Sequence, residues 1–124
     1  MRLGTTAIAF TVLVTALGTA AATTPPDVPG DSFVSMSDAL RAEALSVLGA
    51  FAKEKHACDA PKVLDTRGRK AAGKVSMDGE GRLLSGTITE NWKVDLCGKT
   101  LTLVVVLAPP ATAGASSVTV SEKS

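Results

Sequence analysis

The sequence predicts an α+β protein in which one N-terminal amphipathic helix packs on an antiparallel meander of four to five strands, with one disulfide. Three observations lead to this prediction. Residues 38–55 repeat apolar side chains at three- and four-residue intervals, the spacing of a helix. Residues 86–108 alternate apolar and polar side chains around a central turn, the pattern of a hairpin. Cys58 follows the helix and Cys97 stands at the turn.

The N-terminus predicts export. Arg2 precedes an apolar run from Ala7 to Leu17, and small residues follow up to Ala22. A basic start, an apolar run of about ten residues and a small-residue cleavage site make up a secretory signal peptide. The run is shorter than the roughly 20 residues that span a bilayer. We expect residues 1–22 to be removed, with cleavage before Thr23 or one or two residues earlier, and a periplasmic or secreted product without a membrane span.

The exported chain is expected to be close to neutral. The whole sequence has 13 basic and 12 acidic residues, and Arg2 is the only charged residue within 1–22. General nucleic-acid binding needs a strong basic excess, so the composition argues against it. Residues 23–35 contain three prolines and few apolar side chains, which predicts a flexible leader. A single domain is expected over residues 36–124.

Each element follows from local signals. Ser37 is a helix N-cap and Asp38 favours the first turn, while Pro61 prevents the helix from continuing. The remaining segments are expected, in order, to be a short strand at 62–66, a loop at 67–73, a strand at 74–78, a turn at 78–81, a strand from 82, the hairpin at 86–108 with its turn at 97–99, and an edge strand at 117–120.

The hairpin has one apolar face. Ile88, Trp92, Val94 and Leu96 share one parity, so they lie on the same side of a strand. Trp92 is expected in the core, near its edge, because its indole N–H needs a partner. Residues 104–106 are apolar on both parities, which indicates either a strand covered on both sides or a surface for association.

Two cysteines in an exported chain predict a Cys58–Cys97 disulfide, with two free thiols as the alternative. The bond would tie the exit of the helix to the tip of the hairpin and stabilise the fold by about 4 kcal/mol. Cys97 falls on the parity opposite Trp92. Either a bulge beside the turn resolves this conflict, or the helix covers a different face of the sheet from the one expected.

Candidate catalytic groups are few. Glu90 interrupts the apolar parity beside Trp92 and is expected at a sheet edge or paired with Lys or Arg. Asp95 falls on the opposite face, so the two carboxyls do not form an acid–base pair. His56 is close to Cys58, but a cysteine in a disulfide cannot act as a nucleophile. The sequence contains no zinc-ligand set, phosphate-binding loop or serine nucleophile motif, so no metal, cofactor or catalytic residue is expected.

A local run of basic residues is the other candidate for binding. It suits an anionic partner such as a phosphorylated polymer, acidic lipid or acidic protein, or else it is a solvated loop. Its members are Lys62, Arg67, Arg69, Lys70 and Lys74.

The segment Trp92-Lys93-Val94-Asp95-Leu96-Cys97-Gly98 resembles a W-x-V-x-x-C-G signature of small exported bacterial proteins of unknown function. Those proteins often carry an upstream cysteine, as Cys58 is here. The resemblance implies export and a disulfide, and it implies no activity.

These features lead to one expected function and two alternatives. We expect a non-catalytic envelope or secreted protein that binds another protein or a cell-surface component, in one version as an inhibitor of an envelope hydrolase. The expected contact residues are Glu90, Trp92, Arg67, Arg69, Lys70 and Lys74. The alternatives are a small exported enzyme that uses Glu90 or His56, and a protein that self-associates through residues 104–106.

Overall fold

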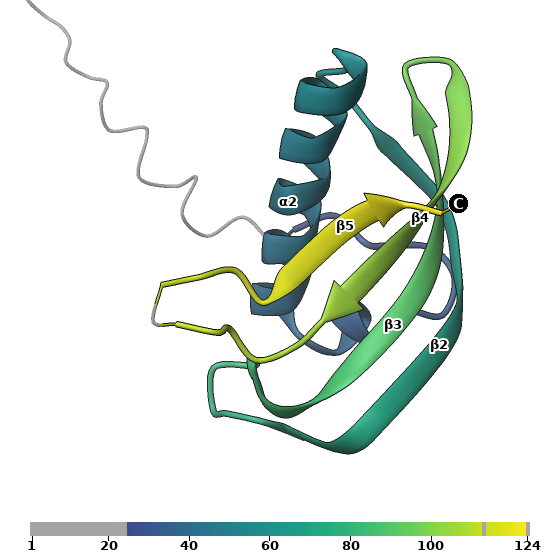
Figure 1. The fold of residues 1–124 in the computed structure, drawn as a ribbon. Helices are drawn as coiled ribbons and strands as arrows, with labels where there is room; N and C mark the ends of the chain where they lie inside the picture. The colour runs from purple at the N-terminus through teal and green to yellow at the C-terminus, as the bar shows by residue number, and fades with distance from the viewer. Residues whose placement is uncertain (1–24, 113, 124) are drawn as a thin grey trace, which may run out of the picture.

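A computed structural model describes residues 25–112 and 114–123, so the expected signal peptide lies outside the described residues. The chain forms a 3₁₀ helix, η3 (Phe33–Met36), an α-helix, α2 (Asp38–His56), and four strands, β2 (Lys62–Met77), β3 (Leu83–Leu96), β4 (Lys99–Leu107) and β5 (Val118–Glu122). The strands make one antiparallel sheet in the order β2-β3-β4-β5 (Figure 1). The predicted α+β class, with one α-helix and an antiparallel meander, is confirmed.

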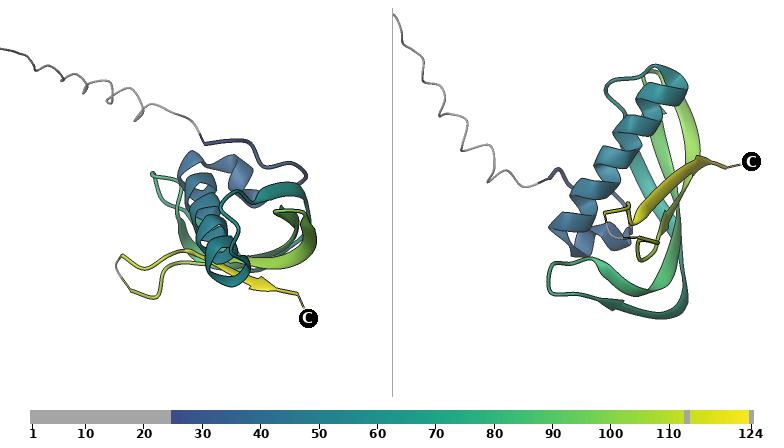
Figure 2. Two further views of the ribbon diagram at one scale, coloured as in Figure 1. Left: turned by 90° about the horizontal axis from the view of Figure 1, so that it is seen from above. Right: turned by 60° about the vertical axis from the view of Figure 1, so that its left-hand side comes forward.

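The core lies between α2 and one face of the sheet, which we call the inner face (Figure 2). On the opposite, outer face, no helix of the described residues covers the strands. The predicted alternation is confirmed, since the even-numbered residues of β3 from Ile88 to Leu96 are buried. In β4, Leu103, Val105 and Leu107 are buried, whereas Val104 and Val106 are half-buried on the outer face.

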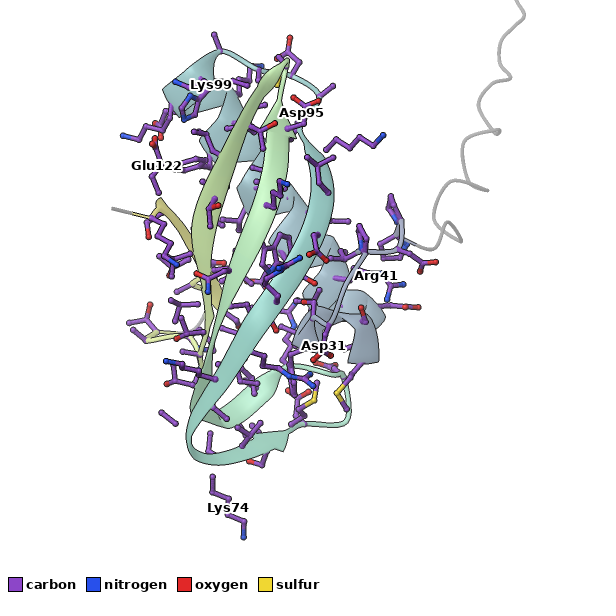
Figure 3. The ribbon with its side chains drawn as sticks, turned by 90° about the vertical axis from the view of Figure 1, so that its right-hand side faces the viewer. Asp31, Arg41, Lys74, Asp95, Lys99 and Glu122 are labelled. Carbon is purple, nitrogen blue, oxygen red and sulfur yellow. A yellow bond between two sulfur atoms is a disulfide. The ribbon has the colours of Figure 1, made fainter. Side chains whose placement is uncertain are left out.

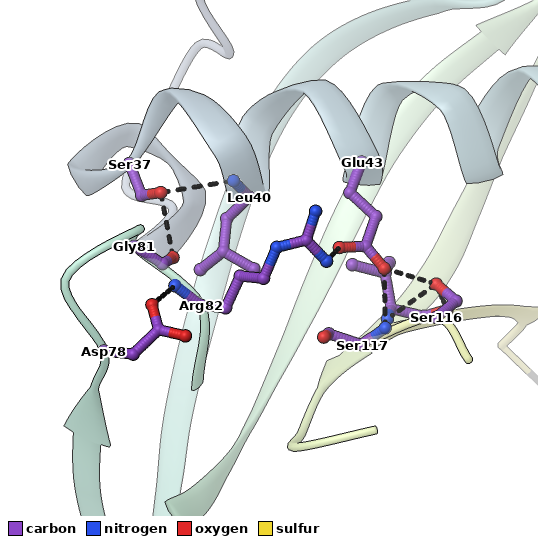
Figure 4. A network of polar contacts seen from close by, with 9 residues as sticks. Ser37, Leu40, Glu43, Asp78, Gly81, Arg82, Ser116 and Ser117 are labelled. Atoms are coloured by element: carbon purple, nitrogen blue, oxygen red, sulfur yellow. Dashed lines mark hydrogen bonds and ion pairs between the residues drawn. The ribbon is translucent and has the colours of Figure 1, made fainter. Parts of the chain in front are cut away.

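The start of α2 is fixed to the turn between β2 and β3. The Ser37 hydroxyl oxygen accepts a hydrogen bond from the Leu40 N–H at 3.2 Å, as the predicted N-cap requires, and the hydroxyl donates to the Gly81 carbonyl at 2.9 Å (Figure 4). In the turn itself, the N–H groups of Arg82 and Glu80 donate to the Asp78 carboxylate and hold the pKa of Asp78 below its usual value. The turn predicted at 78–81 is therefore confirmed.

Glu43 joins the first half of α2 to the segment before β5. Its Oε2 accepts hydrogen bonds from the Ser117 N–H at 2.6 Å and from the Ser116 hydroxyl at 2.7 Å (Figure 4). Arg82 approaches its other oxygen to 3.6 Å, which is an ion-pair distance. Together these contacts hold the helix against the β2–β3 turn and the β4–β5 connection.

The Cys58–Cys97 disulfide is confirmed and joins residues 39 apart at the far end of α2. The predicted bulge beside Cys97 is wrong, because Leu96 pairs directly with Lys99. Cys97 and Gly98 instead form a two-residue turn with φ of 57° and 99°. Positive φ at both central residues is typical of the tight turns that join right-twisted strands. Because Cys97 lies in the turn and not in a strand, its side chain does not follow the alternation of β3.

The loop predicted at 67–73 is wrong, since β2 runs without a break from Lys62 to Met77. Its register against β3 shifts between Arg67 and Lys70 and again between Ala72 and Ser76. These β-bulges accommodate extra residues while the strand remains paired, and each bulge contains a glycine. The glycines that suggested a loop therefore mark irregular pairing within a strand.

The segment predicted as a flexible leader packs on the domain from Val28 onward, so the folded unit begins before residue 36. Val28 is 5% exposed. The Thr66 hydroxyl donates to the Pro29 carbonyl at 2.7 Å, and the Asp31 N–H donates to the Thr66 carbonyl at 3.0 Å. The composition of this segment predicted flexibility, but Thr66 of β2 provides hydrogen-bond partners for its backbone.

Candidate functional site

Glu90 lies inside the core and holds the start of η3 to the sheet. Its side chain is fully buried. Oε1 accepts hydrogen bonds from the Ser32 hydroxyl at 2.7 Å and from the Trp92 indole N–H at 2.8 Å, and Oε2 accepts from the Phe33 N–H at 2.6 Å. The expectation of a sheet edge or a basic partner is wrong, because neutral donors from η3 and β3 satisfy the carboxyl group instead.

This arrangement decides what Glu90 and Trp92 can contribute. Trp92 is 0% exposed, as predicted for a core residue, but its N–H partner is inside the core and not at its edge. Neither side chain presents a surface to a binding partner. Both Glu90 oxygens already accept hydrogen bonds, so the carboxyl group has no open side for a substrate. Glu90 and Trp92 are therefore parts of the fold and not contact residues.

His56 is engaged at the end of α2. Its Nε2 lies 3.0 Å from Oε2 of Glu122 on β5, and its ring centroid lies 5.8 Å from that of Phe51. Cys58, its expected partner in a nucleophilic pair, is held in the disulfide. The geometry therefore gives His56 a contact between helix and strand, and it does not assemble a catalytic pair with Cys58.

The basic residues do not form one patch. Arg67 lies opposite Asn91, on the outer face, and forms an ion pair with Asp65 that lowers the pKa of Asp65. Beyond the first bulge, Arg69 lies 3.2 Å from Asp31 of the leader.

The lysines are spread along the length of the sheet. In the strand register, Lys62 lies opposite Asp95 at the disulfide end, and Lys70 lies opposite Thr89 further along β2. Lys74 projects at the opposite end of the sheet from Asp95 (Figure 3). Because the residues predicted to form a loop belong to one long bulged strand, their charges point to different faces and different ends.

The outer face contains a small polar hollow of about 300 Å³. Its lining residues come from three neighbouring strands: Asp65, Arg67, Asn91, Lys93 and Thr102. Asp65 offsets the charge of Arg67, which leaves Lys93 as the remaining cation of the hollow.

A larger groove, of about 640 Å³, lies between α2 and β5. On the helix side Val47, Ala50 and Phe51 provide an apolar wall, with Glu54 and Lys55 at its end. On the sheet side all five residues of β5 line it, so the groove meets the strand's free edge as well as its inward side chains. We call this feature the α2–β5 groove. Sequence reasoning missed it, because its two walls are more than 60 residues apart in the chain.

The free edge of β5 presents unpaired backbone groups to this groove. The Ala108 N–H bonds to the Ser117 carbonyl and the Lys123 N–H to the Thr102 carbonyl. Hydrogen-bonded pairs alternate along an antiparallel ladder. The register therefore shows which backbone groups between these two bonds point toward β4 and which point away from it. The residues that direct both N–H and C=O away from β4 are Val118, Val120 and Glu122. Among them, the Val118 N–H bonds to the Ser116 hydroxyl oxygen at 3.0 Å.

Comparisons with protein-family models, with curated proteins and with solved structures find no match to this chain. Among the described residues, no helix is long and apolar enough to cross a membrane. Within the same residues, no three His, Cys, Asp or Glu side chains are grouped closely enough to hold a metal ion. A function for this chain is therefore inferred from the geometry of the α2–β5 groove.

Proposed function

We propose that the protein is exported, that it acts without catalysis, and that it binds a segment of another envelope or secreted protein in the α2–β5 groove. The observation that carries this proposal is the pairing of an apolar helix wall with an open strand edge in one groove. Apolar concave surfaces with a few polar groups are the usual form of ligand-binding sites, and an exposed sheet edge can bind an extended segment of another protein. The signal-like N-terminus and the disulfide support an oxidising compartment outside the cytoplasm.

The alternatives receive less support. Glu90 is saturated with hydrogen bonds and His56 is paired with Glu122, which weighs against an enzyme built on either residue. An anionic surface component is also less favoured, because the basic residues lie on two faces and both Arg67 and Arg69 are ion-paired. Self-association through residues 104–106 would use the outer face, where Val104 and Val106 are only half-exposed between polar neighbours.

The test places a photo-crosslinking amino acid at Ala50 in the groove and, in a matched protein, at Ala42. Both alanines are exposed on α2, but only Ala50 lines the groove. We expect the label at position 50 to capture one reproducible envelope or secreted protein that the label at position 42 does not capture. The same exported material gives an intact mass, which should correspond to a chain beginning near Thr23 with one disulfide.

Two arginine substitutions provide the second arm. Arg is a good helix former, so Ala50→Arg and Ala42→Arg should both fold. Ala50→Arg fills the groove and should abolish recovery of the partner, whereas Ala42→Arg should retain it. Equal recovery by both variants would exclude the α2–β5 groove as the binding site.

A further inference from the structure

We infer that the segment bound in the α2–β5 groove is an extended strand, with apolar side chains at alternate positions, that adds to the sheet beside β5. This inference rests on the proposed function and specifies the conformation of the partner. In such strand addition, backbone hydrogen bonds contribute affinity and alternate side chains contribute specificity.

The first support is the set of free backbone groups. Val120 and Glu122 each direct one N–H and one C=O to the open side of β5, and the Ser116 hydroxyl already binds the Val118 N–H. Two donors and two acceptors at alternate residues match one extended backbone. A helix has used these groups internally and cannot supply them.

The second support is the spacing of the apolar wall. Val47 and Phe51 lie one turn apart on α2, a rise of about 6 Å. Alternate side chains of a strand are about 6.6 Å apart. Two successive groove-facing side chains of an added strand therefore match Phe51 and Val47 in spacing, beside the half-buried Val120.

The third support is the contrast between the two edges of the sheet. β2, at one edge, has repeated register shifts and the basic residues described above. Bulges and charges are the devices that block strand addition to an exposed edge. β5, at the other edge, pairs with β4 in one unbroken register and has valines at positions 118 and 120. Among the described residues, the β5 edge lacks the bulges that interrupt β2.

A second copy of this chain fits the edge less well than a different protein. Only a register that places Val120 opposite Glu122 of the second copy pairs the free groups of both strands. That register sets each Glu122 side chain beside a valine on the inner face, where a carboxylate gains nothing from its neighbour. The occupant is therefore assigned to a partner whose alternate residues are apolar.

The experiment compares Val120→Pro with Val120→Ala in the exported, disulfide-bonded protein. Both variants lose the valine side chain, but only proline removes the outward N–H. Proline is tolerated in an edge strand where its nitrogen faces away from the ladder, and thermal unfolding will confirm that both variants fold. The probe is a capped, fluorescent peptide of about nine residues in which valine and threonine alternate, and its binding is measured by anisotropy.

We expect the wild type to bind the peptide, and Val120→Pro to bind it at least about ten-fold more weakly than Val120→Ala does, since both variants lose the same valine side chain. Amide exchange at Val120 and Glu122 should slow when the peptide binds, while Thr119 and Ser121, already bonded to β4, should change little. Equal binding by both variants, or no binding to the wild type, overturns strand addition. The crosslinking experiment at position 50 tests the proposed function independently of peptide binding. A dimer formed by the wild type but not by Val120→Pro would assign the edge to a second copy and overturn the partner assignment.

Discussion

A buried carboxyl group needs a hydrogen-bond partner for each oxygen, and Glu90 obtains three from groups that carry no charge. The donors come from parts of the chain far apart in sequence. Ser32 and Phe33 precede α2, whereas Trp92 lies in β3, two residues after Glu90. One side chain thereby orients the indole ring and anchors η3. The physical role of Glu90 is to join the leader to the core.

Glu90→Gln should lower the free energy of unfolding by about 1–3 kcal/mol. All of the partners of Glu90 are donors, so the amide NH₂ of glutamine sets one donor against another in a dry site. Urea unfolding of the disulfide-intact protein measures the change. Glu54→Gln, at an exposed position of α2, is the matched control and should stay within about 0.5 kcal/mol of wild type. Equal effects of the two substitutions would contradict the anchoring role.

At the scale of elements, residues 28–34 act as a clasp on β2 and β3. The chain turns sharply at Gly30, where φ is +91° and the backbone lies directly against Thr66. Asp31 and Ser32 then bond to Thr66 and Glu90 before η3 begins. The clasp therefore depends on a residue that has no side chain and accepts a left-handed conformation.

Gly30→Ala should destabilise the protein by at least about 2 kcal/mol, because the new Cβ would collide with the backbone of Thr66 in an unfavourable φ region. Gly79→Ala is the control, since a Cβ at Gly79 has no atom within 4 Å and the backbone there needs no positive φ. Thermal unfolding and amide exchange across residues 28–34 measure the effect. If both alanine variants unfold at the same temperature, the clasp contributes nothing to stability.

At the scale of the whole molecule, α2 is fastened to the sheet at both ends. The Ser37 and Glu43 contacts hold its first half, and the Cys58–Cys97 disulfide holds its exit. The α2–β5 groove lies between these fastenings, so its two walls keep a fixed separation. A preformed groove lowers the entropy lost when a partner binds.

Removal of the disulfide by Cys58→Ala with Cys97→Ala should lower the free energy of unfolding by about 4 kcal/mol, the loop-closure entropy of a 39-residue separation. Urea unfolding measures the change. Wild type unfolded with and without reductant provides the comparison free of substitutions. A loss smaller than about 1 kcal/mol in both experiments would show that other contacts hold the end of α2.

The sequence determined what is local in this protein. The spacing of Leu40, Ala44 and Leu48 predicted the helix, the alternation from Ile88 to Leu107 predicted the hairpin, and two cysteines in a chain expected to be exported predicted the disulfide. Helical and strand periods depend only on backbone geometry, so they can be read without knowing what packs against them.

Side chains whose partners are distant in sequence could be placed only from the folded structure. Glu90 was expected to need a charged partner, because nothing near it in sequence predicts that Ser32 and Phe33 will donate to it. The basic residues of β2 are close in sequence and were predicted to form one cluster, but the bulges of β2 place them on different faces. The α2–β5 groove exists because the meander brings β5 back beside the helix. Burial and pairing depend on where the chain returns, and no local pattern contains that information.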